Sequence, residues 1–329
     1  MWTTKRDDVP DILYHYCSTE TFMKIIENKT IRLSNIFKMN DYSEVTHVLK
    51  LLPALLIDEY KKEPFPLKYK GKVNQKAFDD IISDLHNNIN DVKYVSYIAC
   101  FSKHEDDLEQ WRGYGDNGKG IAIGYDGKLL FDLVQQCSFA ITGVSYSVDE
   151  HKKYIRTSIV PEIFKALKKA GDNDNVKNGY CPYEKMVMIC ILSSVSAILL
   201  SAEKYKNKAY KRENEWRICF NPFITQIYYP EDIKRYAANT YYENIVLKKM
   251  AFNNKHGKGI ISYYDLCFEK YSAANDLIKK IIIGPTSNIN DSDLDLKLFL
   301  QVNDFNIGQP SVSLSAIQRS KIRAMAGHL

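Results

Sequence analysis

The chain has 329 residues, of which 45% are hydrophobic and 26% are charged, and its formal net charge is +5. These values match an ordinary soluble globular protein and exclude a chain dominated by low-complexity sequence or by one sign of charge. The length allows one elaborated domain, and the mild positive charge permits an anionic ligand or a nucleic acid without requiring either.

Compartment and membrane association are predicted from the cysteines, the first residues and the longest apolar run. Seven cysteines are scattered without a Cys-x-x-Cys pair, so we expect them to be reduced. The first eight residues lack the apolar core of a signal peptide, which indicates a cytoplasmic protein. Residues 186–202 carry no charge, but four serines dilute them, and this favours a buried core helix over a membrane span.

The first third of the chain predicts two strands that flank a short helix. Residues 11–18 have strand composition, and Ser18 or Thr19 can cap a helix with Phe22, Ile25 and Ile26 on one face. A second strand follows over 30–36. The spacing then predicts helices over 44–92, which we interpret as an insertion before the next strand at 95–102.

A tryptophan and glycine-rich loop, residues 111–120, precedes a predicted strand at 121–125. Four glycines in eight residues indicate backbone freedom or close approach, and Trp111, Arg112 and Tyr114 could supply a stacking ring, a cation and a hydroxyl. The alternative is a glycine-rich hairpin with Trp111 covering the core. The loop is not a Walker phosphate loop, because no Gly-Lys-Ser/Thr follows the glycines.

Downstream, strands and helices follow one another without regular alternation. We predict strands at 139–146, 244–252, 259–268, 278–284 and 312–317, and helices at 149–169 and 291–302. The pattern favours an α+β fold over a doubly wound sheet. We expect a single elaborated domain over 1–329, with core strands near 11–36, 94–126, 138–147 and 213–317 and helical insertions at 44–92 and 149–206.

Two acids, Glu213 and Glu215, begin a predicted strand that runs to Phe220. Because side chains two residues apart on a strand face the same side, we expect both carboxylates on one face. The pair is either solvated and balanced by nearby cations or used chemically. Five cations lie upstream between Lys204 and Arg212 and form a basic rim, which is either a solvated face or a binding surface for an anion.

Five motifs follow one another along nearly the whole chain. They are Leu13-Tyr14-His15-Tyr16-Cys17-Ser18, Arg32-Leu33-Ser34-Asn35 with Met39-Asn40-Asp41, Cys100-Phe101-Ser102, Gln110-Trp111-Arg112-Gly113-Tyr114-Gly115 and Glu213-x-Glu215-Trp216-Arg217. In this order they resemble the bacterial family called domain of unknown function 2971, whose name carries no function, although Gln318-Arg319-Ser320 stands where that pattern suggests Pro-Tyr-Arg.

The order of these motifs is also remotely similar to the ADP-ribosyltransferase superfamily. That resemblance implies a core of two packed, mainly antiparallel sheets and the use of NAD as a substrate, with no metal. It implies that His15 holds a ribose of NAD, that Glu215 engages the nicotinamide ribose and that Glu213 is its upstream partner. An aromatic side chain would stack on nicotinamide, with Tyr114, Trp111 and Tyr125 as candidates.

Residue chemistry agrees with these roles. A carboxylate can stabilise the oxocarbenium ion that develops when the nicotinamide–ribose bond breaks. The planar fork of Arg112 or Arg32 suits the pyrophosphate, and Tyr16 and Ser102 complete the expected NAD-binding set. The acceptor would be nucleic acid or protein, as for a toxin or phage-defence effector.

Three alternatives stay open at this point. His15 could be a packed, satisfied residue, and Glu215 could be tied to Arg112 or to another buried cation. A second alternative is a nucleic-acid-binding protein or a nuclease in which carboxylates bind Mg²⁺. A third is a non-catalytic sensor or partner subunit. The acids considered for Mg²⁺ are Asp41, Glu44, Asp106, Asp107, Glu213 and Glu215.

Overall fold

A computed structural model describes residues 4–39, 96–161, 203–222, 238–254, 259–306 and 308–317, together with Leu51, Leu55, Asp58 and Lys165. Its α-helices are α1 (Thr19–Asn28), α4 (Leu108–Gly113), α5 (Gly127–Gln136), α6 (Val148–Tyr154), α12 (Ala274–Leu277) and α13 (Leu294–Val302). Its other helical turns are the 3₁₀ elements η1 (Arg6–Asp8), η2 (Ile36–Lys38), η5 (Asp116–Gly118) and η7 (Lys208–Glu213), and the π-helical η6 (Ile155–Ile159).

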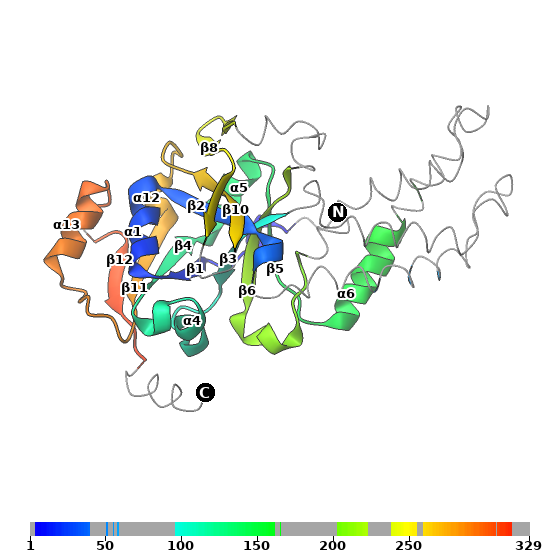
Figure 1. Cartoon of the computed structure of the whole chain (residues 1–329), viewed down its shortest axis with the longest axis horizontal. Coiled ribbons are helices and arrows are strands. Elements are labelled where there is room, and N and C mark those ends of the chain that lie inside the picture. Colours follow the sequence, from blue (N-terminus) through cyan, green and yellow to red (C-terminus); the bar gives the residue numbers. More distant parts are fainter. Residues whose placement is uncertain are drawn as a thin grey trace.

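The described strands form one twelve-stranded sheet (Figure 1). The first six are β1 (Ile12–Cys17), β2 (Thr30–Asn35), β3 (Tyr97–Ser102), β4 (Ile121–Asp126), β5 (Ala140–Gly143) and β6 (Glu215–Phe220). The others are β7 (Thr240–Tyr242), β8 (Ile245–Leu247), β9 (Ala251–Asn254), β10 (Ile260–Cys267), β11 (Ile278–Ile283) and β12 (Ser311–Leu314).

The sheet branches at β3. The main path runs β12-β11-β4-β1-β3-β2-β10-β8-β7, while β6 pairs with β3, β5 with β6, and β9 with β10. Strand β6 pairs with β3 along its whole length. On the other edge of β3, Ser102 pairs with β1, whereas Ile98 and Tyr97 pair with β2. Of these strand pairs only β11–β12 is parallel.

The α+β prediction is therefore confirmed, but the two separate sheets are not found in the described residues. Strand β3 hydrogen-bonds to three neighbours along different parts of its length and so joins the strands into one branched sheet.

The main hydrophobic core lies between one face of the sheet and the helices α1, α5, α12 and α13. Strand residues such as Leu13, Phe101 and Ile218 meet helix residues such as Ile26 and Leu133 there. A smaller cluster lies on the other face, where Trp111 of α4 packs with Tyr14, Tyr16, Ala122 and Ile282. Figure 1 shows α4 at the lower end of the sheet, near the loop that leads into β6.

Several predicted elements are found close to their expected bounds. Helix α1 begins after Ser18, whose hydroxyl accepts a hydrogen bond from the Thr21 amide, and it buries Phe22, Ile25 and Ile26 as expected. Helix α5 was not predicted. Its signals were present in Asp126, which caps the first turn by accepting from the Lys128 and Leu129 amides, and in the buried residues Leu130, Leu133 and Val134.

Some predictions lie largely outside the described residues. These are the insertion at 44–92, the last part of the helix at 149–169, and the apolar run at 186–202. The first part of the helix at 149–169 is found as α6 and η6. Within the described part of the chain, no helix combines the length and the apolar character that crossing a membrane requires.

Candidate functional site

The two acids of the sequence motif lie on either side of a sharp backbone turn. Glu213 ends η7, Asn214 adopts a left-handed conformation with φ of 44°, and Glu215 begins β6. The expectation that both acids belong to one strand is therefore wrong. Along β6, Trp216 and Ile218 enter the main core, so Glu215 and Arg217 face the opposite side of the sheet.

Glu215 is almost completely buried and is held by two cations. Arg217 Nε donates to Oε1 at 2.8 Å and Arg217 Nη2 donates to Oε2 at 3.2 Å, while Lys206 Nζ lies 2.9 Å from Oε2. Burial alone would raise the pKa of Glu215, but the charges of Arg217 and Lys206 and the bonds from Arg217 outweigh it and lower the pKa to about 2. The carboxylate is therefore ionised in the folded protein.

Lys206 joins the two acids. Its Nζ lies 2.5 Å from Oε2 of Glu213, and Tyr114 donates its hydroxyl to Oε1 of the same carboxylate at 2.9 Å. Burial lowers the pKa of Lys206, but the charge of Glu215 together with the interactions of Cys100 and Tyr114 outweighs burial, so the net shift is upward and the ammonium stays charged. We call Lys206, Glu213, Glu215 and Arg217 the ion-pair network, in which two cations balance two acids.

The backbone around the ion-pair network is fixed by three side-chain groups. Ser102 donates to the Glu213 carbonyl at 2.8 Å, and the Tyr146 hydroxyl accepts from the Glu215 amide at 2.9 Å. Arg217 Nη1 donates to the Glu203 carbonyl at 3.0 Å. Burial raises the pKa of Tyr146 to about 12, so this phenol stays protonated. These bonds hold the acids in place from both sides of the turn.

Helix α4 places Tyr114 against Glu213. Asp107 caps the helix by accepting from the Glu109 and Gln110 amides, and Tyr114 follows its last residue. Tyr114 keeps 37% of its surface exposed, whereas Trp111 is fully buried with its ring edge on Tyr16 at a centroid distance of 4.8 Å. Trp111 is therefore a core residue rather than a stacking ring, as the alternative reading of this loop predicted.

Two of the four glycines of the loop, Gly115 and Gly120, serve close packing. A Cβ on Gly115 would lie 2.5 Å from the Trp111 ring, and one on Gly120 would lie 2.0 Å from the Cys17 carbonyl oxygen. The close approach predicted from the sequence is thus an approach to the protein's own residues.

His15 lies on the opposite face of the sheet from Glu215. Tyr14 pairs with Ser102, and Ser102 pairs with Glu215, so these three residues share a face and His15 does not. The His15 ring contacts Phe101 of the main core, and its Nδ1 donates to the Cys100 carbonyl at 3.0 Å. The structure does not bring together the histidine and the glutamate that the sequence resemblance paired.

Other predicted NAD-binding residues are engaged within the fold. Arg32 forms two bonds to Asp265 of β10, at 2.9 and 3.1 Å, and stacks on Tyr263. Tyr16 donates its hydroxyl to the His104 carbonyl. Arg112 is partly exposed on α4. Tyr125 is buried in the main core, which leaves Tyr114 as the exposed aromatic among the three candidates.

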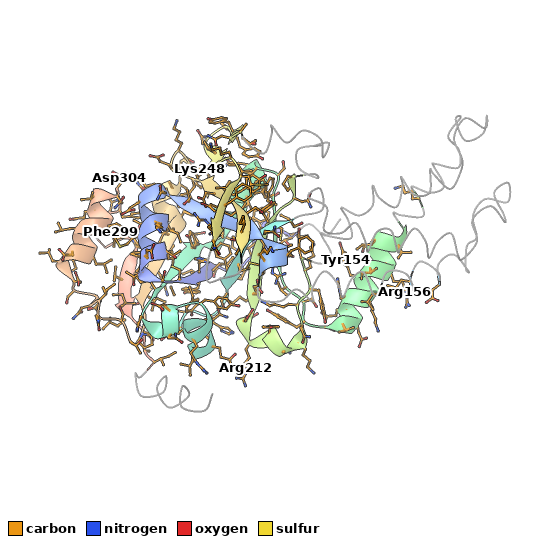
Figure 2. The ribbon with its side chains drawn as sticks, viewed as in Figure 1. Tyr154, Arg156, Arg212, Lys248, Phe299 and Asp304 are labelled. Atoms are coloured by element: carbon orange, nitrogen blue, oxygen red, sulfur yellow. The ribbon has the colours of Figure 1, made fainter. Side chains whose placement is uncertain are left out.

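The basic rim does not form one continuous surface. Lys206 is buried in the ion-pair network, and Lys204 is partly buried with its Nζ over the Tyr154 ring. Arg212 projects from the surface below β6 (Figure 2) and pairs with Glu109. Lys208 and Lys211 are exposed on η7. The cations of this run therefore divide between a structural network and a solvated surface.

Each described acid that was considered for Mg²⁺ binding has partners within the protein. Asp107 caps α4, and Asp106 accepts hydrogen bonds from Trp111 and from residues after β12. Glu213 and Glu215 belong to the ion-pair network, while Asp41 and Glu44 lie outside the described residues.

Sequence reasoning missed the roles of Lys206 and Tyr146. Lys206 was counted as one cation of the rim, and nothing in its spacing marks it as the partner of residues seven and nine positions later. Tyr146 follows β5 and reaches the β6 backbone only because β5 and β6 pair.

Comparison with protein families gives a match over the stretch that carries this network. Residues 110–218 match the family described as Protein of unknown function (DUF2971). This confirms the family resemblance inferred from the motifs. The DUF2971 stretch runs from Gln110 on α4 to Ile218 on β6 and contains Tyr114 and the whole ion-pair network. No curated protein and no solved structure matches the chain.

Proposed function

We propose that this protein is an NAD-dependent ADP-ribosyltransferase-like enzyme whose reacting carboxylate is Glu213. The observation that carries the proposal is the unequal exposure of two acids fixed by one lysine. The Glu213 side chain is 15% exposed and accepts a hydrogen bond from the partly exposed Tyr114, whereas that of Glu215 is 5% exposed and enclosed by cations. Glu213 is the acid of this pair that a ligand can reach.

The proposed chemistry uses the negative charge of Glu213. The bond between nicotinamide and C1′ of the ribose breaks, nicotinamide leaves with the electron pair, and the carboxylate stabilises the oxocarbenium ion that remains. An acceptor then forms a bond to C1′ and loses a proton. Lys206 holds Glu213 in place, and Tyr114 supplies an aromatic ring beside it.

Neither Glu215 nor His15 reacts with the substrate in this proposal. Glu215 is a positioning residue, because it acts on the reacting carboxylate through Lys206. His15 faces the main core and receives no role. From the sequence resemblance we carry over the further proposal that the acceptor is nucleic acid or protein and that the protein is a toxin or phage-defence effector.

The test combines calorimetry with an assay of nicotinamide release, with water as the acceptor. We expect the wild-type protein to bind NAD and release nicotinamide, and Glu213→Gln to slow the release about a hundredfold. Glu27→Gln, which changes an exposed glutamate of α1, serves as the matched control and should leave the rate unchanged.

Thermal unfolding of both variants checks that they are folded. The proposal fails if the wild-type protein does not bind NAD, or if Glu213→Gln releases nicotinamide at the wild-type rate.

A further inference from the structure

A second carboxylate, Asp106, connects the end of the described chain to α4. Its Oδ1 accepts from the Trp111 indole Nε1 at 2.5 Å and from the Ser315 hydroxyl at 2.7 Å, and its Oδ2 accepts from the Ala316 amide at 2.7 Å. Three donors from two distant parts of the sequence therefore meet on one side chain. Hydrogen bonds to an ionised carboxylate are among the stronger ones in proteins.

The segment after β12 is itself anchored to the sheet. The Ser315 amide donates to the Ile283 carbonyl of β11 at 2.9 Å, and the Ile317 amide donates to the Ser315 hydroxyl at 3.1 Å. Ile317 packs on the smaller hydrophobic cluster that contains Trp111. Asp106 thus attaches α4 to β11 through a short segment held by both backbone bonds and apolar contact.

Helix α4 transmits this attachment to Glu213. Trp111 lies in the middle of α4, and the Tyr114 amide donates to the Gln110 carbonyl at 2.9 Å, so the two side chains belong to one helical unit. The Tyr114 hydroxyl then donates to Glu213. On the other side of Trp111, Tyr16 fixes the loop before α4, because its hydroxyl accepts from the Asp107 amide at 3.1 Å.

We propose that Asp106 is a positioning residue for Glu213, which acts by fixing α4 so that Tyr114 stays on the Glu213 carboxylate. The inference rests on the proposed function for its effect on NAD, whereas the link from Asp106 to Tyr114 can be measured without any ligand. Asparagine at position 106 has nearly the same shape but no negative charge, and its amide group would face one of the present donors.

The first experiment measures hydrogen exchange of the α4 amides in the wild-type protein and in Asp106→Asn. We expect exchange in α4 to accelerate about tenfold, because a charge-assisted hydrogen bond is lost, while exchange in β2 stays the same. Asp116→Asn is the matched control, since Asp116 is an exposed aspartate in the segment that follows α4 and asparagine tolerates its φ of 51°. Unchanged exchange in α4 overturns the inference, whatever the behaviour toward NAD.

The second experiment is a double-mutant cycle on NAD affinity with Tyr114→Phe. If Asp106 acts through the Tyr114 hydroxyl, Asp106→Asn weakens NAD binding about fivefold in the wild-type background and has no effect in Tyr114→Phe. An equal loss in both backgrounds overturns the inference, because it indicates a general loss of stability. Ser315→Ala removes one of the two donors from the C-terminal segment and supplies a milder variant if Asp106→Asn does not fold.

A failure of the proposed function gives a different result. In that case the wild-type protein does not bind NAD, and the exchange experiment alone decides whether Asp106 positions Tyr114.

Discussion

At the scale of single residues, the decisive feature is a buried carboxylate that remains ionised. Glu215 has almost no contact with solvent, yet Arg217 and Lys206 supply two positive charges within hydrogen-bond distance. Removing one partner of such a buried pair leaves an uncompensated charge, which costs about 3 to 5 kcal/mol. The network therefore makes Glu215 a structural anchor, and Glu213 is the more exposed acid of the pair.

The pH dependence of stability tests the ionisation of Glu215. The folded-state pKa of about 2 lies below the ordinary value of 4.5, so as pH falls the unfolded chain binds the proton first. The stabilisation is fully present above about pH 4.5 and is lost as the pH falls to about 2, and it amounts to about 3 kcal/mol. In Glu215→Gln we expect this part of the acid dependence to be absent from the free energy of unfolding.

The free energy of unfolding is measured by denaturant titration at several pH values from about 4.5 down to about 2. Glu27→Gln should retain the wild-type acid dependence, because Glu27 is exposed. An acid dependence of Glu215→Gln equal to that of the wild-type protein would show that Arg217 and Lys206 do not hold the carboxylate as described.

At the scale of elements, the position of α4 depends on how closely the following loop approaches β1. Gly120 precedes β4 and lies against the carbonyl of Cys17, the last residue of β1. Its amide donates to the Gly115 carbonyl, and its own carbonyl accepts from the Gly284 amide. These backbone contacts hold Gly120 in place and leave no room for a side chain at this position.

Substitution of this glycine tests the packing of the loop. In Gly120→Ala the new Cβ would meet the Cys17 oxygen at 2.0 Å, and because that atom belongs to the backbone it cannot move aside easily. We expect a loss of about 3 kcal/mol in the free energy of unfolding. Gly113→Ala is the control, since no atom lies within 4 Å of its Cβ, and its effect should stay below about 1 kcal/mol.

Equal stability of the two alanine variants in chemical denaturation would contradict this description of the loop. It would mean that β1 and the loop can separate at little cost.

At the scale of the whole molecule, the sheet mixes strands from both ends of the chain. The N-terminal strand β1 lies between β3 and β4, and β4 in turn pairs with β11, which pairs with the late strand β12. Strands from the first half of the chain, β2 and β4, therefore pair with β10 and β11 from the second half. One elaborated domain over 1–329 stays a prediction.

The interleaved sheet predicts a single cooperative transition. Tryptophan fluorescence, measured in a Trp2→Phe background so that it reports on Trp111 and Trp216 on opposite faces of the sheet, should change at the same denaturant concentration as far-ultraviolet circular dichroism. Two separate transitions would show that the β6 side and the β11 side of the sheet unfold independently.

Local signals in the sequence determined much of the secondary structure. The Ser18 cap and the apolar spacing of α1 predicted that helix, and the short apolar runs predicted β1, β3, β4 and β11, because hydrogen bonding and side-chain periodicity act over a few residues. The α+β class followed from the irregular order of these elements. Of the five motifs on which the DUF2971 resemblance was based, those at 110–115 and 213–217 lie within the matched residues 110–218.

Only the tertiary structure decided which residues meet. The register of β1 on β3 and of β3 on β6 places His15 and Glu215 on opposite faces, and a shift of one residue would reverse that result. Lys206 contacts both acids because the turn at Asn214 and the path of the chain before η7 bring its ammonium close to the two carboxylates. Such pairings depend on contacts between segments distant in sequence, and for this reason the paired acids could be found from the sequence while their chemical environment could not.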